Sequence, residues 1–386
     1  MTTMALVLIA LPIGLALYAY VVYPAGLFLL SRGKAPDPGT DPAEWPRVTI
    51  NLPVYNEEAA LAATLESLLA IDYPPERLHI LVLSDASSDR TDEIAASYAD
   101  RGVQLVRLPE RRGKTAAENE AAAHIGGPIV VNTDATTRIQ RDALKALVRR
   151  FNDPTVGVAS GRDVSFSLGE ADANRGEAGY VGYEMWVRDL ETRLGTIVGA
   201  SGCFFAIRRN LFLKLVPEAL SRDFASPLVA REHGYRSVSV PDAVCYVPRA
   251  KSLQAEVRRK TRTMARGLDT LWYKRHLLNP MRYGTFSLLL ISHKLVRWLA
   301  FLAAPLAVVG LVMLSAQSVV ARAVLVAGLV LSAVGALVLR SSESRRPPKP
   351  LATLAFVVGT VGAALAAWRK ALAGERNPVW EPTRRQ

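Results

Sequence analysis

Long apolar stretches lie near both ends of the chain, and a polar, mixed region separates them. Ala5–Leu30 contains no charged residue, and Phe286–Leu339 contains only three. About 20 apolar residues suffice for a helix to cross a bilayer, so both stretches predict membrane helices. The first is longer than the apolar core of a signal peptide, and we expect it to remain as an anchor. In the second, Trp298–Leu314 and Val319–Leu339 are each long enough to cross.

Two further segments allow more than one interpretation. Thr285–Arg297 mixes apolar and basic residues, which is typical of an interfacial helix. Leu351–Trp368 is short and rich in Ala and Gly. If it crossed the bilayer alone, the basic tail 369–386 would lie outside, against the rule that Lys and Arg flank the cytoplasmic side. Either this segment is interfacial or Phe286–Ala304 also crosses.

Between the apolar stretches, β-branched runs alternate with segments of helical periodicity. This alternation predicts an α/β fold with a parallel sheet and right-handed crossovers. The predicted strands are Val48–Leu52, Leu78–Leu83, Val103–Arg107, Ile129–Asn132 and Val156–Ala159, and the predicted helices are Glu57–Ala70, Asp89–Tyr98, Lys114–Ile125 and Arg141–Phe151. The expected organisation is an anchor at 1–31, a linker at 32–46, the α/β domain at 47–280, an interfacial helix and membrane segments at 281–368, and a basic cytosolic tail at 369–386.

The charge distribution orients these segments. The chain has 47 Lys and Arg against 35 Asp and Glu, a net charge of +12. Basic residues gather in Arg249–Arg275 and beside the apolar stretches, as they do on the cytoplasmic flanks of membrane helices. We therefore expect a multi-pass protein of the inner membrane with its N-terminus outside and its α/β domain in the cytosol.

Composition excludes several classes of protein. Of the 386 residues, 50% are hydrophobic and 21% charged, which excludes a disordered chain. No zinc-finger spacing or basic stretch interleaved with aromatic residues indicates nucleic-acid binding, so no nucleic-acid partner is expected. In a cytosolic domain, Cys203 and Cys245 are expected to be reduced thiols.

Polar clusters follow the predicted strands, where parallel sheets bind their ligands. Asp85 follows the second strand and Asp134 the fourth, and two such carboxylates suit a divalent cation that bridges phosphates. Arg111–Lys114 opens a helix after the third strand, either as a site for an anion or as a solvated loop. Asn56 and Asp89 could equally cap the helices that follow them. The glycine patterns of nucleoside triphosphatases and dinucleotide enzymes are missing.

Together these motifs resemble the family 2 glycosyltransferases, in particular the membrane-embedded group of cellulose, hyaluronan and chitin-oligosaccharide synthases. The motifs cover about Arg47–Trp272. The resemblance implies an α/β fold of GT-A type, with a Rossmann-like, mostly parallel sheet. It also implies a hexosyl- or N-acetylhexosaminyl-transferase that works with inversion and with Mg²⁺ or Mn²⁺. The donor would be a nucleotide-sugar, with a UDP-sugar favoured, and the acceptor a glycan or a lipid-linked molecule at the cytosolic face, in polysaccharide or cell-envelope glycan synthesis.

The resemblance also assigns roles in donor and metal binding. The residues it implies for nucleotide-sugar binding are Pro53, Tyr55, Glu57, Asp85, Lys114, Arg259 and Arg262. Asp134-Ala135-Thr136 matches the family's Asp-x-Asp metal motif, with Thr136 in place of the second carboxylate. Asp134 is therefore the implied metal ligand, and the substitution by Thr136 puts metal affinity or preference in doubt.

The acceptor site and the catalytic base follow from two later motifs. Ser201, Gly202 and Cys203 lie in a segment that resembles the lining of the acceptor site. Asp223 aligns with the catalytic Asp, and transfer to a hydroxyl needs such a base to take its proton. Arg222 replaces the family's acidic neighbour and would lower the pKa of Asp223 if its guanidinium pointed inward. Asp223 could also cap a helix over 224–233.

Departures from the family pattern leave the product and the activity open. Arg259–Thr263 stands where processive members carry Gln-x-x-Arg-Trp, so Thr263 replaces the stacking Trp. Trp272, on the same predicted helix, could substitute only if the geometry allowed it. A processive synthase and an enzyme of limited addition both remain possible. The substitutions at Thr136 and Arg222 also allow a non-catalytic membrane subunit that binds a nucleotide-sugar or a partner glycosyltransferase. Asn377–Arg384 resembles a tail of bacterial members and suggests a docking strand.

Overall fold

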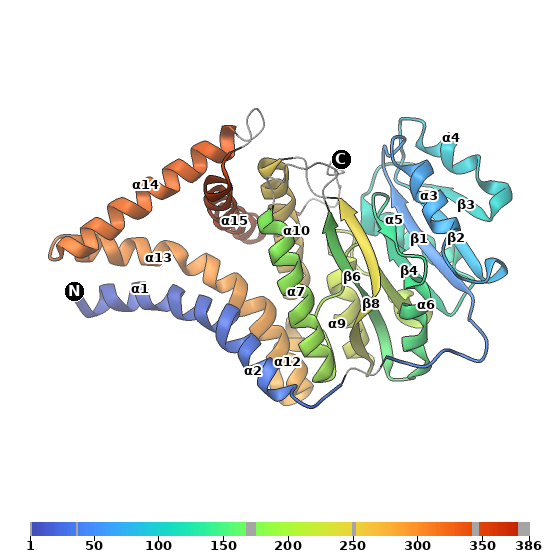
Figure 1. Ribbon diagram of the computed structural model, residues 1–386, viewed down its shortest axis with the longest axis horizontal. Coiled ribbons are helices and arrows are strands. Elements are labelled where there is room, and N and C mark those ends of the chain that lie inside the picture. Colours follow the sequence, from blue (N-terminus) through green and yellow to red (C-terminus); the bar gives the residue numbers. More distant parts are fainter. Residues whose placement is uncertain (1, 36–37, 167–174, 249–251, 342–346, 377–386) are drawn as a thin grey trace.

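The computed structural model describes residues 2–35, 38–166, 175–248, 252–341 and 347–376. A mixed α/β domain forms one half of the molecule, and long helices form the other (Figure 1). The tail motif Asn377–Arg384 and its expected docking lie outside the described residues.

An eight-stranded sheet forms the centre of the α/β domain, in the order β3-β2-β1-β4-β7-β6-β8-β5. Its strands are β1 (Val48–Val54), β2 (Leu78–Ser84), β3 (Val103–Arg107), β4 (Ile129–Thr133), β5 (Arg138–Ile139), β6 (Val156–Phe166), β7 (Phe204–Arg208) and β8 (Arg236–Pro248). All five predicted strands are present, and β1 to β4 pair in parallel as expected. The unpredicted β7 is antiparallel to β4 and β6 and lies between them.

Helices cover both faces of the sheet. They are α3 (Leu61–Leu69), α4 (Thr91–Ala96), α5 (Lys114–Glu120), α6 (Ala143–Val148), α7 (Arg175–Arg193), α8 (Arg209–Phe212) and α9 (Arg222–Glu232). The next helix, α10 (Leu253–Tyr273), contacts α9. α3 begins four residues later than predicted, because the segment before it joins the neighbouring loop. Asn56 has a φ of 52° and accepts a hydrogen bond from Ser88 N, and Glu57 N donates to Thr91 Oγ1. Asn56 therefore links two loops rather than capping a helix.

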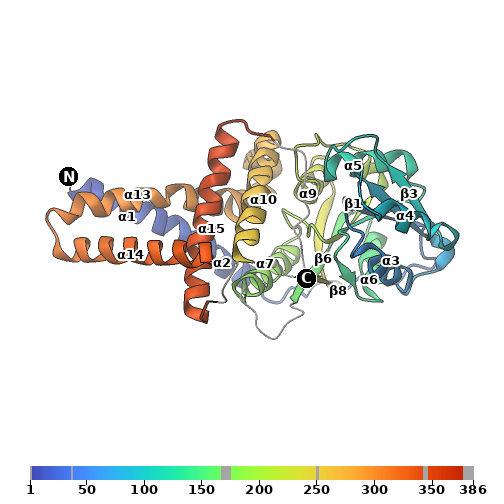
Figure 2. The same ribbon diagram turned by 90° about the horizontal axis from the view of Figure 1, so that it is seen from above.

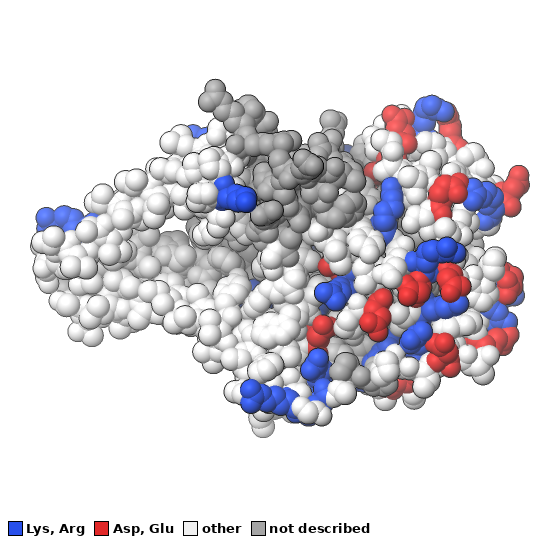
Figure 3. All heavy atoms as spheres, viewed as in Figure 1, with Lys and Arg blue, Asp and Glu red and all other residues white. Residues whose placement is uncertain are grey.

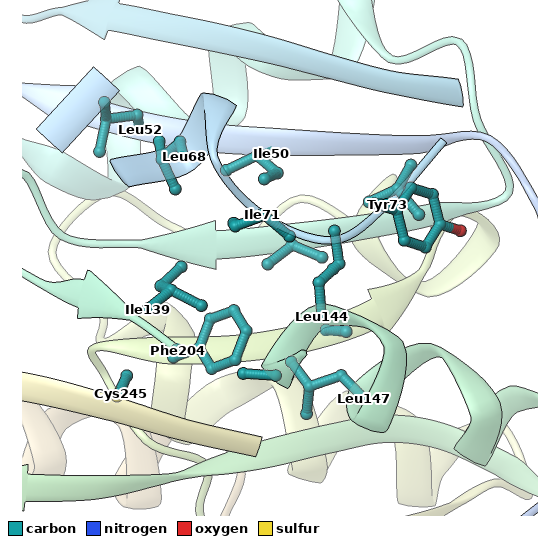
Figure 4. Packing of buried hydrophobic residues seen from close by; sticks show 14 of the residues in the cluster. Ile50, Leu52, Leu68, Ile71, Tyr73, Ile139, Leu144, Leu147, Phe204 and Cys245 are labelled. Atoms are coloured by element: carbon teal, nitrogen blue, oxygen red, sulfur yellow. The ribbon is translucent and has the colours of Figure 1, made fainter. Parts of the chain in front are cut away.

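Alternate residues of β2 pack into two different apolar cores, one on each face of the sheet. Ile80 and Val82 pack into the first, with Leu52 and Leu144, and Figure 4 shows part of this cluster. Leu81 and its alternate neighbour Leu83 pack into the second, on the other side of the sheet. Strands buried on both faces read as continuous apolar runs, which is why these segments could be identified from the sequence.

Among the described residues, four helical segments are long and apolar enough to cross a membrane. They are Thr2–Leu30, which contains α1 (Thr2–Leu17) and α2 (Tyr23–Leu30), then Thr285–Ser315, which contains α12 (Thr285–Leu290) and α13 (Arg297–Ser315), then α14 (Val319–Ser341) and α15 (Lys349–Leu372). A short α11 (Pro280–Tyr283) precedes them. The expected interfacial segment Thr285–Arg297 is therefore not a separate helix, because a π-helical turn at Ile291–Val296 joins it to α13.

The long helices differ in direction. α1 and α13 run side by side, and α14 diverges from them after the turn that follows α13 (Figure 1), whereas α15 crosses them steeply and lies along α10 (Figure 2). A Cβ on Gly310 of α13 would lie 2.6 Å from Ala5 O of α1, so these two helices touch through their backbones. Charged side chains gather on the α/β domain, whereas the helical half shows few on the face in Figure 3.

A third apolar cluster joins the two halves of the molecule. Phe286 and Leu290 of α12 pack with Tyr23 of α2 against Val187 of α7 and Leu228 of α9. The beginning of the helix that continues into α13 is thus fixed on the α/β domain.

Candidate active site

A cavity of about 750 Å³ lies between the sheet and the long helices. Its polar lining includes Glu57, Lys114, Asp134, Thr136, Gly202, Cys203, Asp223, Arg259 and Arg262. Its apolar lining includes Trp298, Phe301, Phe356, Val361 and Ala364 from α13 and α15. The cavity therefore brings together most of the site residues expected from the sequence, and one wall of it belongs to the long helices.

Lys114 and Asp134 form an ion pair at the polar end. Lys114 Nζ donates to Asp134 Oδ1 at 2.6 Å and to Gly202 O at 3.3 Å. Burial by itself would lower the pKa of Lys114, but Asp134 and Glu118 together raise it. Lys114 is therefore a permanent cation next to the carboxylate that the sequence assigned to a metal.

Asp85 shapes the loop in front of α5. Its Oδ1 accepts a hydrogen bond from Arg112 N at 2.7 Å, and its Oδ2 accepts one from Gly113 N at 2.9 Å. Gly113 has a φ of 99°, which favours glycine. Two backbone N–H groups of the segment Arg111–Lys114, the candidate anion site, are thus bound to Asp85, and Asp85 is not among the residues that line the cavity.

Three more of the expected donor-binding residues, Pro53, Tyr55 and Glu57, lie in β1 or in the loop that follows it. Pro53 lies inside β1, in register with Leu83 of β2. Tyr55 lies under Arg111, whose guanidinium carbon is 3.8 Å from the ring centroid. Glu57 lines the cavity, so of these three expected donor-binding residues it alone is in the cavity wall.

Asp223 stands at the start of α9, where the cavity meets the Gly202 segment. Ser221, not Asp223, is the residue that precedes the helix, so the predicted capping role of Asp223 is wrong. Ser221 Oγ donates a hydrogen bond to Asp223 Oδ1. A Cβ on Gly202 would lie 3.0 Å from Asp223 Oδ2, so the absence of a side chain there leaves room for the carboxylate.

The Arg222 side chain points away from Asp223, the next residue in the sequence. Its Nε lies 3.5 Å from Glu118 Oε2, and its side chain also donates to Asn119 Oδ1 and lies over the Phe212 ring. Burial raises the pKa of Glu118, although Lys114 and Arg222 oppose this. The Arg222 guanidinium therefore interacts with Glu118 and Asn119 of α5.

Ser201 organises the turn before β7 instead of lining the cavity. Its Oγ accepts hydrogen bonds from Cys203 N and Phe204 N and donates one to Asp163 Oδ1. Cys245 Sγ contacts the same Asp163 oxygen at 3.3 Å. Cys203 and Cys245 are not joined by a disulfide, as expected, and of the three expected acceptor residues Gly202 and Cys203 line the cavity.

The α10 helix contributes the basic wall. Arg259 donates two hydrogen bonds to Glu256, both at 2.8 Å, and Arg262 lines the cavity beside it. Trp272, the candidate stacking residue, is 68% exposed and is not among the lining residues. Trp298 of α13 lines the cavity instead, with its ring 5.9 Å from that of Phe224.

Several lining residues were not singled out from the sequence. They are Asp163 of β6, Glu184 and Arg188 of α7, and Lys294 and Arg297 of the helix Thr285–Ser315. A signal existed for the last two, because ionisable residues in an apolar helix commonly face a protein interior or a polar cavity.

Comparison with known proteins identifies the domain. Residues 49–216 match the family described as "Glycosyl transferase family 2". The chain is 28% identical over 263 residues to an N-acetylglucosaminyltransferase of Rhizobium sp. (strain N33). The matched region covers 62% of this chain and 57% of the relative. It is 26% identical over 270 residues to poly-beta-1,6-N-acetyl-D-glucosamine synthase of Staphylococcus aureus (strain COL). This match covers 68% of this chain and 63% of the relative. The chain thus spans about three fifths of the length of these curated relatives.

A solved structure matches almost the whole chain. The mannosyltransferase from Pyrobaculum calidifontis, in complex with GDP-Man and Mn²⁺, covers 97% of this chain and 99% of its own, with a TM-score of 0.72 and 26% identity. The expected α/β fold of GT-A type, with a Rossmann-like, mostly parallel sheet and membrane-length helices at both ends, is confirmed. Residues 49–216 therefore match a family 2 glycosyltransferase domain, in a chain whose overall fold is similar to that of a mannosyltransferase.

Proposed function

We propose that this enzyme transfers a sugar, with inversion, from a nucleoside-diphosphate sugar to a hydroxyl group of a glycan or lipid-linked acceptor. The observation that carries the proposal is the shared cavity, which is lined by Asp223, Asp134, Lys114 and Arg262 together. A base, a metal ligand and two cations are what direct displacement of a diphosphate needs. The named relatives, two of which act with N-acetylglucosamine and one with mannose, support the sugar-transfer class.

Asp223 is the proposed base. Its carboxylate takes the proton of the acceptor hydroxyl while the new bond to the anomeric carbon forms and the bond to the donor diphosphate breaks. The Ser221 hydroxyl holds Oδ1, and Oδ2 lies on the open side next to Gly202. One carboxylate oxygen is thus fixed by a neighbour while the other faces the acceptor segment.

Lys114, Arg259 and Arg262 are the proposed partners of the leaving diphosphate. Cations preorganised in a desolvated site stabilise charge that develops in the transition state. Asp85, Pro53 and Tyr55 act indirectly in this proposal, by shaping the strand and loops beside the nucleotide.

Asp134 is the proposed protein ligand for Mg²⁺ or Mn²⁺. Asp134 and Thr136 both line the cavity and offer the oxygen ligands that these ions prefer. Among the described residues, no group of three or more His, Cys, Asp or Glu side chains could hold a metal ion by itself, so the donor phosphates would complete the shell. When bound, the ion supplies positive charge to the departing diphosphate.

The membrane arrangement follows from helix direction and charge. α1, α13 and α14 cross the bilayer, whereas α15 lies along α10 at the cytosolic surface with the catalytic domain. This places the tail 369–376 on the cytosolic side with the other basic flanks, and it agrees with the steep angle of α15 in Figure 2. The localisation we propose is the inner membrane, with the active site in the cytosol.

The test is release of nucleoside diphosphate by the full chain in nanodiscs, screened over UDP-, GDP- and dTDP-sugars with Mg²⁺ or Mn²⁺ and a lipid extract as acceptor source. Turnover with one donor is expected, and it should be lost with a chelator and in Asp223→Asn. Undiminished turnover in Asp223→Asn would reject the assigned base. No turnover with any donor would favour the non-catalytic subunit.

A further inference from the structure

A second charged cluster lines the cavity, apart from the residues assigned to the donor and the base. It consists of Glu184 and Arg188 from α7 together with Lys294 and Arg297 from the helix Thr285–Ser315. Because the two helices belong to different halves of the molecule, the cluster lies where the catalytic domain meets the membrane segment.

Glu184 is the centre of this cluster. Its Oε1 accepts a hydrogen bond from Lys294 Nζ at 3.2 Å, and its Oε2 accepts one from Arg297 Nη1 at 2.7 Å. Arg188 Nε lies 3.8 Å from Oε1, beyond hydrogen-bond distance. Behind the cluster, His293 lies between Glu184 and Glu191, whose own Oε1 also accepts a hydrogen bond from Tyr23.

The cluster has more positive than negative charge at the cavity surface. Two lining carboxylates, Glu184 and the Asp163 that interacts with Arg188, oppose the three cations Arg188, Lys294 and Arg297, and Glu191 is not part of the lining. Arg188 is 8% exposed and Arg297 3%. Arg188 Nε and Nη1, and Arg297 Nε and Nη2, make no hydrogen bond to the residues that the structure describes. Buried cations with unused donors are costly unless an anion compensates them.

The cluster lies between the proposed base and an apolar wall. Lys294 Nζ is 6.0 Å from the ring centroid of Phe224, the residue after Asp223, and 3.6 Å from where a Cβ on Gly199 would lie. On the membrane side, the cavity continues along Trp298, Phe301 and Phe356. An occupant of the whole cavity would therefore offer a hydroxyl near Asp223, an anionic group near Lys294 and an apolar chain beyond it.

We propose that Arg188, Lys294 and Arg297 bind the phosphate group of a lipid-linked acceptor, whose hydrocarbon chain lies against Trp298 and Phe301. This inference rests on the proposed function, because it names the acceptor class for the same active site. A polymer of neutral sugars offers no anion to these cations, so the cluster favours limited addition to a lipid carrier over processive synthesis. Arginine donors are well suited to phosphate, which they can bind through two hydrogen bonds.

The test is calorimetric binding of farnesyl phosphate to the full chain in detergent, without a sugar donor. Farnesyl phosphate is expected to bind at least tenfold more tightly than farnesol or inorganic phosphate, because it alone offers both the anion and the chain. Arg188→Gln and Lys294→Gln should each weaken its binding at least tenfold. Arg188→Lys should retain most of it, and Arg193→Gln, an exposed residue on the same helix, should bind as the wild type.

Nucleoside-diphosphate binding is measured on the same samples and should be unchanged in all four variants. This separates the two proposals, since a failure of donor binding or turnover in the wild type would strike the proposed function and leave the farnesyl phosphate result intact. Equal binding of farnesyl phosphate by wild type, Arg188→Gln and Lys294→Gln would overturn the inference. So would equal binding of farnesol, or displacement of farnesyl phosphate by phosphatidylglycerol at similar concentration, which would make the site a general lipid site.

Discussion

Arg222 and Glu118 form a buried ion pair behind the proposed base, with Arg222 Nε 3.5 Å from Glu118 Oε2. Arg222 immediately precedes Asp223 and stands at the position where the resemblance to family 2 implies an acidic residue. The pair shows how this chain accommodates the exchange, because Glu118 on α5 supplies a carboxylate to the guanidinium. Asp223 is therefore left facing the cavity without an adjacent ion pair from Arg222.

This pair should stabilise the domain only as a unit. In Glu118→Gln, Arg222 would remain buried without its counter-charge, and a loss of roughly 3–5 kcal/mol is expected. In the double variant Glu118→Leu, Arg222→Met, no charge remains buried, so the loss should be smaller than that of the single variant. Thermal unfolding in detergent provides the measurement. A double variant that is less stable than Glu118→Gln would contradict the assignment.

Gly202 should control the position of Asp223. In Gly202→Ala, the new Cβ would lie 3.0 Å from Asp223 Oδ2 and would push the carboxylate by a few tenths of an ångström. A misplaced catalytic group commonly costs rate, so kcat should fall about tenfold or more while donor binding is unchanged. Gly126→Ala, at an exposed site with nothing near the added atom, is the matched control. Equal kcat in both variants would argue against Asp223 as the base.

Asp134 should set the metal requirement. Asp134→Asn removes the anionic ligand, so the Mn²⁺ concentration for half-maximal turnover should rise by at least about tenfold. Loss of the Lys114 ion pair accompanies this change. Titration of Mn²⁺ at saturating donor measures the effect, beside Asp142→Asn, which is exposed and should leave the titration unchanged. An unaltered Mn²⁺ dependence in Asp134→Asn would exclude Asp134 as the ligand.

Acid should weaken the domain through Asp153. Burial alone would raise the pKa of this carboxyl group, but hydrogen bonds from Arg236 and Thr155 lower it from 3.8 to about 2. The ionised form is therefore favoured by folding, and its contribution of up to about 2 kcal/mol is present above pH 4 and lost as the pH falls through 2. Melting temperatures between pH 5 and pH 2 should fall less steeply in Asp153→Asn than in the wild type or Asp100→Asn. Parallel curves for all three proteins would contradict this.

The membrane arrangement can be tested with one added cysteine at a time in a Cys203→Ser background, in which the remaining Cys245 is buried. The turn between α13 and α14 lies at the same end as the N-terminus, where Thr2 Oγ1 donates to Gln317 Oε1 at 3.3 Å. With three crossings, Gln317→Cys faces outside and Glu375→Cys faces the cytosol. A membrane-impermeant maleimide should label the first in intact cells and the second only after permeabilisation. Labelling of both in intact cells would show that α15 crosses.

Much of the fold could be predicted because buried parallel strands are continuous apolar runs. Leu78–Leu83 and Ile129–Asn132 carried this signal, and both are strands. β7 was missed because its segment follows a glycine-rich turn, and its antiparallel place between β4 and β6 depends on contacts far apart in sequence. Local periodicity does not record such pairings.

The candidate site was predictable where residues share a motif and unpredictable where they meet across the molecule. Asp134 and Asp223 stand at the ends of elements that could be recognised, and both line the cavity. The sequence around Trp298 does not indicate a place in the cavity wall, because a Trp in an apolar helix is commonly an anchor at the membrane interface. Its place beside Phe224 exists only after the membrane helix packs on the catalytic domain.

The close fit of the N-terminal helix affects how this enzyme can be handled. Tyr23 donates a 2.5 Å hydrogen bond to the fully buried Glu191, and Ala5 O touches the backbone of Gly310. Cutting the chain in the linker to obtain a soluble fragment would remove the donor from that carboxylate and uncover the apolar surface around Phe286. Such a fragment should aggregate, so protein for crystals or assays has to be extracted from membranes with its first helix attached.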